Sequence, residues 1–510
     1  MTPSDGDFGL LSPVSASPLV AALTGDHAVI AAILAVEAAW ASVLEDAGLV
    51  PDGAAAVVAH AADPARYDVA AIAERAQGGA NPVIPLLAEL RKNVNAADAD
   101  RADGPLDAGA AVHTSLTSQD VLDTALMLLA RNVRTTLLAE VRSTTTALAA
   151  LARGHADTLC VGRSLTQHAL PYTFGLKASQ WFHGLAAAAR RLEALELPVQ
   201  FGGASGTLAA GSVLSVRALT AQIPTARADG ARDITPFSLA DGLSIKLGLA
   251  PAPAPWHTNR LAVTALGDAV AAVVDAMGKM ASDVLFLSRP EVAELAEPRA
   301  AGRGVSSAMP QKQNPVLSVL VRSAALQAPG LAAQLHVAAA NFNDERPDGA
   351  WHSEWPALRQ LLRLGLGAAM QLKELAHGLQ VFPEAMRRNL DLSGPLLLSE
   401  GVMAAVAPLI SASKDSGLAE AKARLQDVVD RTLQAPAGEQ SRIYAKLLLE
   451  AILKDKLSDE KLTQLLDPAN YVGEAREISR RILAAYPDYA TPDAYNTEAS
   501  DIDPKGAHRG

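Results

Sequence analysis

Apolar residues recur at helical spacing over unusually long stretches of this chain. Between Val121 and Arg153 there is neither proline nor glycine, and residues 117–120 (Thr-Ser-Gln-Asp) in front resemble a capping box, which predicts a helix start. A helix of that length spans about 50 Å at about 1.5 Å per residue. Its apolar positions recur every three or four residues: Leu122, Leu126, Leu129, Val133, Leu137 and Val141.

A second long helix is predicted from Asn259 to Ser288, just before Arg289-Pro290. Its apolar residues are spaced alternately four and three positions apart: Leu266, Val270, Val273, Met277, Met280, Val284 and Leu287. This heptad pattern predicts a partner helix alongside. A third helix is predicted to begin at Asn314-Pro315, because asparagine is a good N-cap and proline suits the first helical position. Helices of this length predict a long bundle, and further exposed apolar stripes on it would favour an oligomer.

The predicted fold class is therefore all-α, with a central long-helix bundle. Proline and glycine punctuation divides the chain into an N-terminal helical domain (1–111), the bundle domain (112–393) and a C-terminal helical domain (394–485). We expect a loop-rich excursion from the bundle over residues 224–256. The polar tail over residues 486–510 is expected to be disordered.

Composition narrows the class of protein. Hydrophobic residues make up 49% and charged residues 19% of the 510 residues, which excludes a mostly disordered chain. The net charge is −11 with no basic cluster, which argues against a nucleic-acid partner. The single cysteine, Cys160, excludes a disulfide framework and a multi-cysteine metal site.

The sequence also predicts a soluble, cytoplasmic protein with no membrane partner. The N-terminal segment is acidic and has no basic region, so it does not resemble a signal peptide. The apolar run from Val29 to Val36 ends at Glu37, and no run reaches the roughly 18 residues that a membrane span requires.

Three stretches differ from ordinary bundle sequence. The first, residues 112–120, places His113, Thr117 and Ser118 at the start of a long helix, where backbone N–H groups and the helix dipole favour an anion. The alternative is that Thr117 and Ser118 only cap the helix.

The second stretch, residues 162–171, gathers Arg163, Gln167 and His168 around one turn. His168 is a candidate acid or base, although a lone histidine is more often structural.

The third stretch, residues 302–315, combines a Gly/Ser loop with Lys312 and Asn314 before a helix start. A loop without large aliphatic anchors can close over a site as a lid does. The alternative, a plain linker, does not account for this concentration of serine, lysine and asparagine.

Residues 306–315 (SSAMPQKQNP) match SSxMPxKxNP, the signature of the fumarase/aspartase superfamily, at all seven fixed positions. The resemblance extends over nearly the whole chain. Within the superfamily the sequence is most similar to bacterial 3-carboxy-cis,cis-muconate cycloisomerases. The stretches that carry this similarity are residues 162–163, 165–171, 200–206, 255–258, 351–355, 387–390 and 466–468.

The resemblance implies a three-domain, nearly all-α subunit. It also implies a homotetramer built around a twenty-helix bundle, with each active site shared between three subunits. The implied substrate is a small polycarboxylate, and neither a metal nor an organic cofactor is implied.

Members of this superfamily make or break a bond β to a carboxylate, through a carbanion whose charge spreads onto a carboxyl group. In the cycloisomerase, a substrate carboxylate adds to a conjugated double bond to close a γ-lactone, and the α-carbon is then protonated. Ser306 occupies the position of the superfamily's catalytic serine. Lys312, Asn314 and the helix start at Thr117-Ser118 suit the developing negative charge. Arg346 resembles the superfamily's carboxylate-binding arginine.

Two departures from the superfamily pattern bear on the substrate. Many members have histidine where this chain has Leu165, and here the histidine is His168, as in cycloisomerases. Ser115 stands where relatives commonly have glycine.

Three functional hypotheses follow: a cycloisomerase of protocatechuate breakdown, a β-eliminating lyase of a substituted succinate (resembling adenylosuccinate lyase), and a non-catalytic oligomer. The presence of Ser306, Lys312 and Asn314 disfavours the last.

Overall fold

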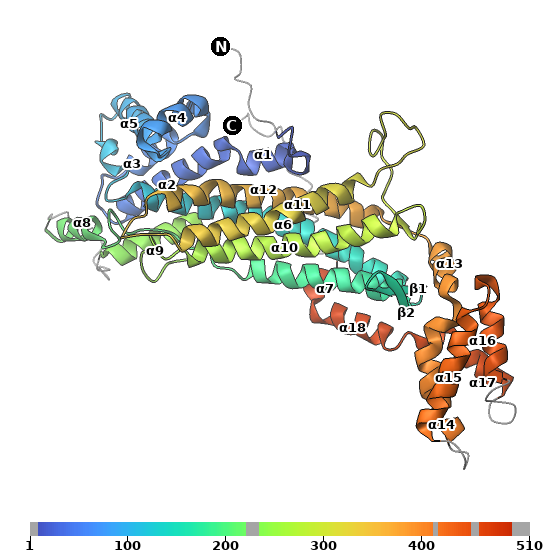
Figure 1. The fold of residues 1–510 in the computed structure, drawn as a ribbon. Coiled ribbons are helices and arrows are strands. Elements are labelled where there is room, and N and C mark those ends of the chain that lie inside the picture. The colour runs from blue at the N-terminus through green and yellow to red at the C-terminus, as the bar shows by residue number, and fades with distance from the viewer. Residues whose placement is uncertain (1–8, 221–233, 412–416, 450–457, 492–510) are drawn as a thin grey trace. The chain divides into compact units, whose positions relative to one another are not determined.

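The computed structural model describes residues 9–220, 234–411, 417–449 and 458–491 (Figure 1). Most of these residues are helical, and the strands form two short two-stranded sheets. The predicted all-α class is thus confirmed, apart from these small sheets.

The chain forms two compact units, each assembled from separate segments of sequence. The first unit comprises residues 1–140, 188–278 and 320–371, and the second comprises 141–187, 279–319 and 372–510. The division into domains that run in sequence order therefore stays a prediction.

The first unit contains the N-terminal helices and two helices from the middle of the chain. Their bounds are α1 Pro18–Thr24, α2 Asp26–Asp46, α3 Ala54–Ala61, α4 Val69–Ala76, α5 Val83–Ala99, α8 Ala209–Thr220 and α9 Pro236–Leu247. Five longer helices contribute residues to both units: α6 Ser118–Gly154, α7 Phe174–Glu193, α10 Leu261–Leu287, α11 Val316–Ala339 and α12 Gly349–Gly378.

The second unit contains the strands and the C-terminal helices. The strands are β1 Leu159–Ser164, β2 Gln167–Thr173, β3 Leu295–Ala296 and β4 Gln380–Val381, and both pairs are antiparallel. The helices are α13 Pro383–Ser393, α14 Ser399–Ser411, α15 Leu418–Leu433, α16 Gln440–Leu448, α17 Asp459–Leu465, α18 Ala475–Ala485 and α19 Pro487–Ala490. Buried residues of α14 to α17 share one hydrophobic cluster.

The three long helices predicted from periodicity are confirmed as α6, α10 and α11. Every apolar position of the heptad pattern in α10 is buried, and so are the six apolar positions predicted for α6. Within the first unit, glycines allow close helix packing. A Cβ added at Gly365 of α12 would lie 3.0 Å from Val270 of α10 and 3.3 Å from Leu137 of α6. Helix α12 therefore packs directly against both α10 and α6 (Figure 1).

Two expectations need correction. Part of the supposed loop-rich excursion is helix α9, which begins with a capping box between Thr235 and Ser238 and has Pro236 in its first turn. Residues 224–233 lie outside the described part of the chain. Ordered structure also continues past residue 485, because α19 forms there and buries Tyr489. The rest of the tail, residues 492–510, lies outside the described part.

The expectation that no segment could span a membrane is also too strict. Four helical stretches are long and apolar enough by length and composition: 18–46, 261–287, 316–339 and 383–411. The alanine-rich composition explains this, because such helices are apolar even where they contain a few charges. In α10 the apolar positions serve the protein core instead, since the whole heptad pattern is buried there.

Candidate active site

A short loop before α6 holds His113 in an unusual conformation. The residue has φ of 61°, in the left-handed region, which costs a non-glycine residue about 1–2 kcal/mol. Its backbone N–H donates to Oε2 of Glu37 at 2.9 Å, and its Nδ1 lies 2.7 Å from Oε1 of the same carboxylate. The Glu37 side chain is fully buried, whereas the His113 side chain is 14% exposed.

The next residues of this loop are held by neighbouring elements. The indole Nε1–H of Trp40, one turn after Glu37 on α2, donates to the carbonyl of Thr114 at 2.8 Å. Ser115 also has a left-handed backbone, with φ of 65°, and its hydroxyl donates to the carbonyl of Ala210 at 3.2 Å. Glycine adopts this backbone conformation without the steric cost that serine bears.

The start of α6 brings together three of the predicted binding residues. Nη1 of Arg346 donates to the hydroxyl of Thr117 at 3.0 Å, and Ser118 is the first residue of the helix. The backbone N–H of Thr117 donates to Asp120 at 2.9 Å, so half of the predicted capping box is present. The Thr117 hydroxyl thus bonds a cationic side chain and lies where a carboxylate could be bound.

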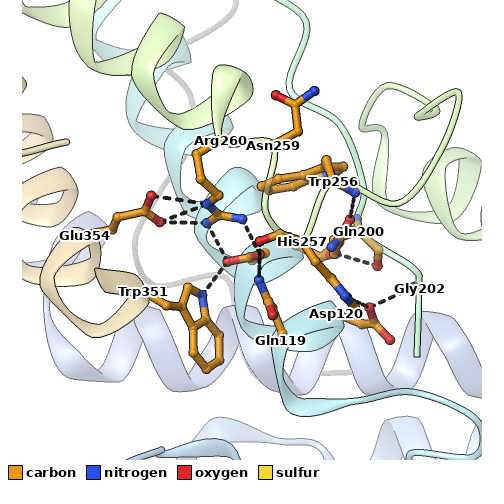
Figure 2. Close-up of polar contacts among 12 residues, drawn as sticks. Gln119, Asp120, Gln200, Gly202, Trp256, His257, Asn259, Arg260, Trp351 and Glu354 are labelled. Atoms are coloured by element: carbon orange, nitrogen blue, oxygen red, sulfur yellow. Dashed lines mark hydrogen bonds and ion pairs between the residues drawn. The ribbon is translucent and has the colours of Figure 1, made fainter. Parts of the chain in front are cut away.

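Asp120 anchors the loop that follows α7. Its buried carboxylate accepts backbone N–H groups from Gly202 at 2.9 Å and Gly203 at 3.0 Å, in addition to that of Thr117. Nε2 of His257 lies 2.9 Å from Oδ1 (Figure 2). Four donors therefore converge on one carboxylate, which fixes the glycine loop against the helix start that carries Thr117.

A second buried ionic cluster lies one turn further along α6. Arg260 pairs with Glu354 at 2.7 Å, and its guanidinium stacks on Trp256 (Figure 2). Arg260 also pairs with Asp123 at 2.7 Å. Burial alone would lower the pKa of Arg260, but the two carboxylates outweigh it and the pKa is raised. Trp351 donates to Asp123 at 2.9 Å. Trp256, Trp351 and Glu354, which belong to the stretches that resemble cycloisomerases, are therefore part of this buried cluster.

In the second unit, the stretch containing His168 forms a β-hairpin. Strands β1 and β2 are joined by Leu165 and Thr166, both with positive φ, as in a type I′ turn. Leu165 is 93% exposed at this tip, and Gln167 donates to the Thr166 hydroxyl at 3.2 Å.

His168 and Arg163 face each other across this hairpin but have different partners. Arg163 forms an ion pair with Glu294, which is buried and also accepts from Asn389 at 2.8 Å. Nδ1 of His168 lies 2.9 Å from the hydroxyl of Ser393. Burial, and then the charge of Arg163, lower the pKa of His168 below its usual value, so the ring is neutral at pH 7.

The signature loop closes on itself at its base. Val305 and Gln313 form an antiparallel bridge, and the backbone N–H and side-chain amide of Asn314 both donate to the carbonyl of Gly304, at 2.8 and 3.2 Å. Just inside this bridge, the Ser306 hydroxyl accepts the N–H of Met309 at 3.2 Å, and Lys312 is exposed. The loop therefore presents Ser306 and Lys312 from a fixed base.

The N-terminus of α11 is capped by a residue that the sequence analysis missed. The carboxylate of Glu297 accepts the N–H groups of Leu317 at 3.0 Å and Ser318 at 2.7 Å. The side chain of Asn314, predicted as the cap, bonds Gly304 instead. Because Glu297 already occupies the first turn of α11, these two N–H groups are not open to a substrate anion.

The predicted residues thus fall into two sets. His113, Thr117, Ser118 and Arg346 belong to the first unit, and Arg163, Gln167, His168, Ser306, Lys312 and Asn314 belong to the second. Within the described residues, no group of three or more histidine, cysteine or acidic side chains could hold a metal ion.

Comparison with known proteins agrees with the motif. Residues 20–330 match a family model described as a lyase. The chain is 41% identical to a nitrosuccinate lyase of Streptomyces davaonensis, over 95% of this chain and 96% of that protein. It is 36% identical to a 3-carboxy-cis,cis-muconate cycloisomerase of Bradyrhizobium diazoefficiens, over 93% of this chain and 97% of that protein.

A solved structure is similar along its whole length. The 3-carboxy-cis,cis-muconate lactonizing enzyme from Pseudomonas putida superposes with a TM-score of 0.79 at 32% identity, covering 95% of this chain and 100% of that one. The helical architecture, the signature loop and these relatives agree, and the chain therefore belongs to the lyase family of the fumarase/aspartase superfamily and is an enzyme.

Proposed function

We propose that this enzyme is a cycloisomerase that converts 3-carboxy-cis,cis-muconate to a carboxymuconolactone in aromatic catabolism. The observation that carries the proposal is the closed signature loop, in which Ser306 and Lys312 stand next to the Val305–Gln313 bridge, one on each side of the loop. The position of the histidine, with Leu165 at the hairpin turn and His168 on its second strand, is the one that resembles cycloisomerases within the superfamily.

In this reaction a carboxylate oxygen of the substrate forms a bond to the β-carbon of a conjugated double bond. The π electrons move onto the neighbouring carboxyl group, and the α-carbon then takes up a proton, so the overall change is an isomerisation. We assign proton delivery to Ser306. The lowered pKa of His168 makes the imidazolium, its strongly acidic form, the minor form at pH 7. In this assignment the Ser306 hydroxyl gives its proton to the carbanion, and the alkoxide left on Ser306 takes up a proton from water before the next turnover.

The charge that develops on the substrate needs fixed donors in a site shielded from water. Lys312 and Asn314 supply a cation and an amide in the second unit, and Arg346 and Thr117 are joined at 3.0 Å in the first. We propose that Arg346 grips one substrate carboxylate, with His113 and Ser118 beside it, and that Gln167 and Arg163 line the histidine side of the site.

We further propose a cytoplasmic homotetramer whose active sites combine residues from three subunits. Exposed apolar side chains on the long helices support association: Leu261 is 71% exposed, Leu326 74% and Val337 57%. The substrate is a small polycarboxylate, no nucleic acid or membrane is a partner, and neither a metal nor an organic cofactor takes part. Light scattering on purified protein measures the subunit number.

A second candidate is β-elimination from a substituted succinate, favoured by the 41% identity to nitrosuccinate lyase. A base removes the proton on one carbon of nitrosuccinate, a double bond forms, and the C–N bond breaks to release nitrite, leaving fumarate. A neutral His168 suits the role of that base.

One pair of assays separates the two candidates. The purified protein is given 3-carboxy-cis,cis-muconate and, separately, nitrosuccinate, with Ser306→Ala as the inactive control. Loss of diene absorbance with a lactone identified by NMR supports the cycloisomerase. Formation of fumarate and nitrite, without lactone from the muconate, replaces it with the lyase. Failure of a folded protein to convert either substrate would refute both.

A further inference from the structure

Glu37 is a carboxyl group in an otherwise apolar part of α2. Its side chain is fully buried, and its neighbours Ile33, Leu34 and Trp40 are buried as well. A buried carboxylate is costly unless hydrogen-bond donors surround it. Both oxygens of Glu37 find their donors in a single residue, His113, through the backbone N–H at 2.9 Å and Nδ1 at 2.7 Å.

This contact sets the orientation of the imidazole. An ionised carboxylate can only accept hydrogen bonds, so Nδ1 of His113 must carry the hydrogen that faces Glu37. The second ring nitrogen, Nε2, lies on the far side of the ring, and no hydrogen bond to it is found among the described residues. The ring is partly exposed, so Nε2 is the atom that a bound molecule can reach.

The same helix also sets the backbone of the loop. The Glu37 carboxylate accepts the backbone N–H of His113, whose φ is 61°. The indole N–H of Trp40 donates to the carbonyl of Thr114, the next residue. A left-handed histidine persists only where its surroundings enforce it. Two side chains from one face of α2 provide that constraint.

We propose that Glu37 is a positioning residue for His113: it fixes the backbone in the left-handed region and holds the ring with Nδ1 inward and Nε2 toward the substrate. The inference rests on the proposed function only in that His113 contacts the substrate. Glu37 itself, being fully buried, acts through His113.

The test variant is Glu37→Gln, which keeps the size of the side chain but removes its charge. The amide of glutamine can donate to Nδ1 and thereby favour the tautomer with hydrogen on Nε2, reversing the hydrogen-bonding character of that atom. We expect kcat/KM to fall about 10- to 100-fold, as is typical when the partner that orients a histidine is lost. If His113 binds a substrate carboxylate, most of the change should be in KM.

A double-variant comparison separates positioning from a general structural effect. If Glu37 acts through His113, the variant with both Glu37→Gln and His113→Ala should be no slower than His113→Ala alone, within about twofold. The matched control is Glu45→Gln, on the same helix, whose carboxylate accepts the N–H of Ala55 at 2.7 Å. That control should keep full activity.

A third measurement does not depend on the substrate. Amide hydrogen exchange, read by mass spectrometry on peptides covering residues 112–116, should be faster in Glu37→Gln and unchanged in Glu45→Gln. Unchanged exchange in Glu37→Gln overturns the inference even if the protein converts neither assay substrate. Wild-type kcat/KM in Glu37→Gln, or a double variant whose loss equals the product of the two single losses, overturns it as well.

Discussion

Two carboxylate–histidine pairs in the first unit have the same chemistry but different surroundings. Glu37 with His113 and Asp120 with His257 each join a fully buried carboxylate to an imidazole at 2.7 and 2.9 Å. His113 is 14% exposed and directs Nε2 away from its partner, whereas His257 is 3% exposed and its Nδ1 is buried without a partner.

The two pairs differ in how deeply the imidazole is buried, and this difference decides whether a bound molecule can reach the ring. Around His257 the chain is so tight that a Cβ added at Gly202 would lie 2.9 Å from the ring. No substrate can reach that ring. The carboxylate of Asp120 also accepts hydrogen bonds from three backbone N–H groups. The His257 pair therefore holds a loop, while the His113 pair holds a ring that stays partly exposed.

The largest expected effect on stability is that of Asp120→Ala. It removes the acceptor of three backbone N–H groups and of His257, and breaking such a buried pair costs about 3–5 kcal/mol. The thermal unfolding midpoint measures this loss, with Asp100→Ala, an exposed aspartate at the end of α5, as the control. An unchanged midpoint would contradict the anchoring role of Asp120.

Replacing each histidine by alanine should give opposite results. His257→Ala leaves Asp120 with its backbone donors but creates a cavity, so we expect about 1–3 kcal/mol less stability and turnover close to normal. His113→Ala should lower turnover at least tenfold with little change in the unfolding midpoint. The unfolding midpoints and the kcat/KM values of the two variants test this difference. If both variants lost stability and activity to the same extent, the distinction between the two histidines would be contradicted.

A third histidine extends the comparison through its response to pH. Because burial and Arg163 lower the pKa of His168, its ring stays neutral as the pH falls through about 6.5, and protonates only in more acidic solution. The acid limb of kcat/KM should therefore lie below pH 6.5 and should be absent in His168→Ala. A limb at or above pH 6.5 that disappears in that variant would contradict the lowered pKa.

The smallest expected effect is that of Ser115→Gly. Glycine adopts φ of 65° without the steric cost that serine bears, although the hydrogen bond to Ala210 is lost. We expect a net gain of about 0.5–1 kcal/mol, read as a small rise in the unfolding midpoint. Ser212→Gly, which removes a helical serine without left-handed backbone, should be destabilising instead.

Local sequence patterns predicted the long helices well, because apolar spacing and missing proline and glycine act within a few turns. The bounds predicted for α6 and α10 differ from the observed ones by only a few residues. The hairpin at residues 159–173 was not predicted, since Leu165 and Thr166 are unusual at left-handed turn positions. Both residues are exposed, and the antiparallel pairing of β1 with β2 closes the turn, which no pattern of the sequence reports.

The framework residues were missed for a related reason. Glu37 and His113 are 76 positions apart in the sequence. Other partners in these clusters are further apart, such as Asp123 and Arg260, which are separated by 137 positions. A signal for Glu37 was present, because a single acid that interrupts an apolar helical run indicates a buried charge in need of a partner. The identity of that partner could not be read from the sequence.

By itself, the sequence determined the helical class and the family, because these depend on short-range periodicity and on a motif of adjacent positions. The residues that carry the chemistry stay a prediction from the same motif. Only the tertiary structure decided which polar residues hold the framework and which face outward. Those roles follow from burial and from donors that arrive from distant segments. The cost of burying an unpaired charge then selects Asp120, Arg260 and Glu37 as anchors.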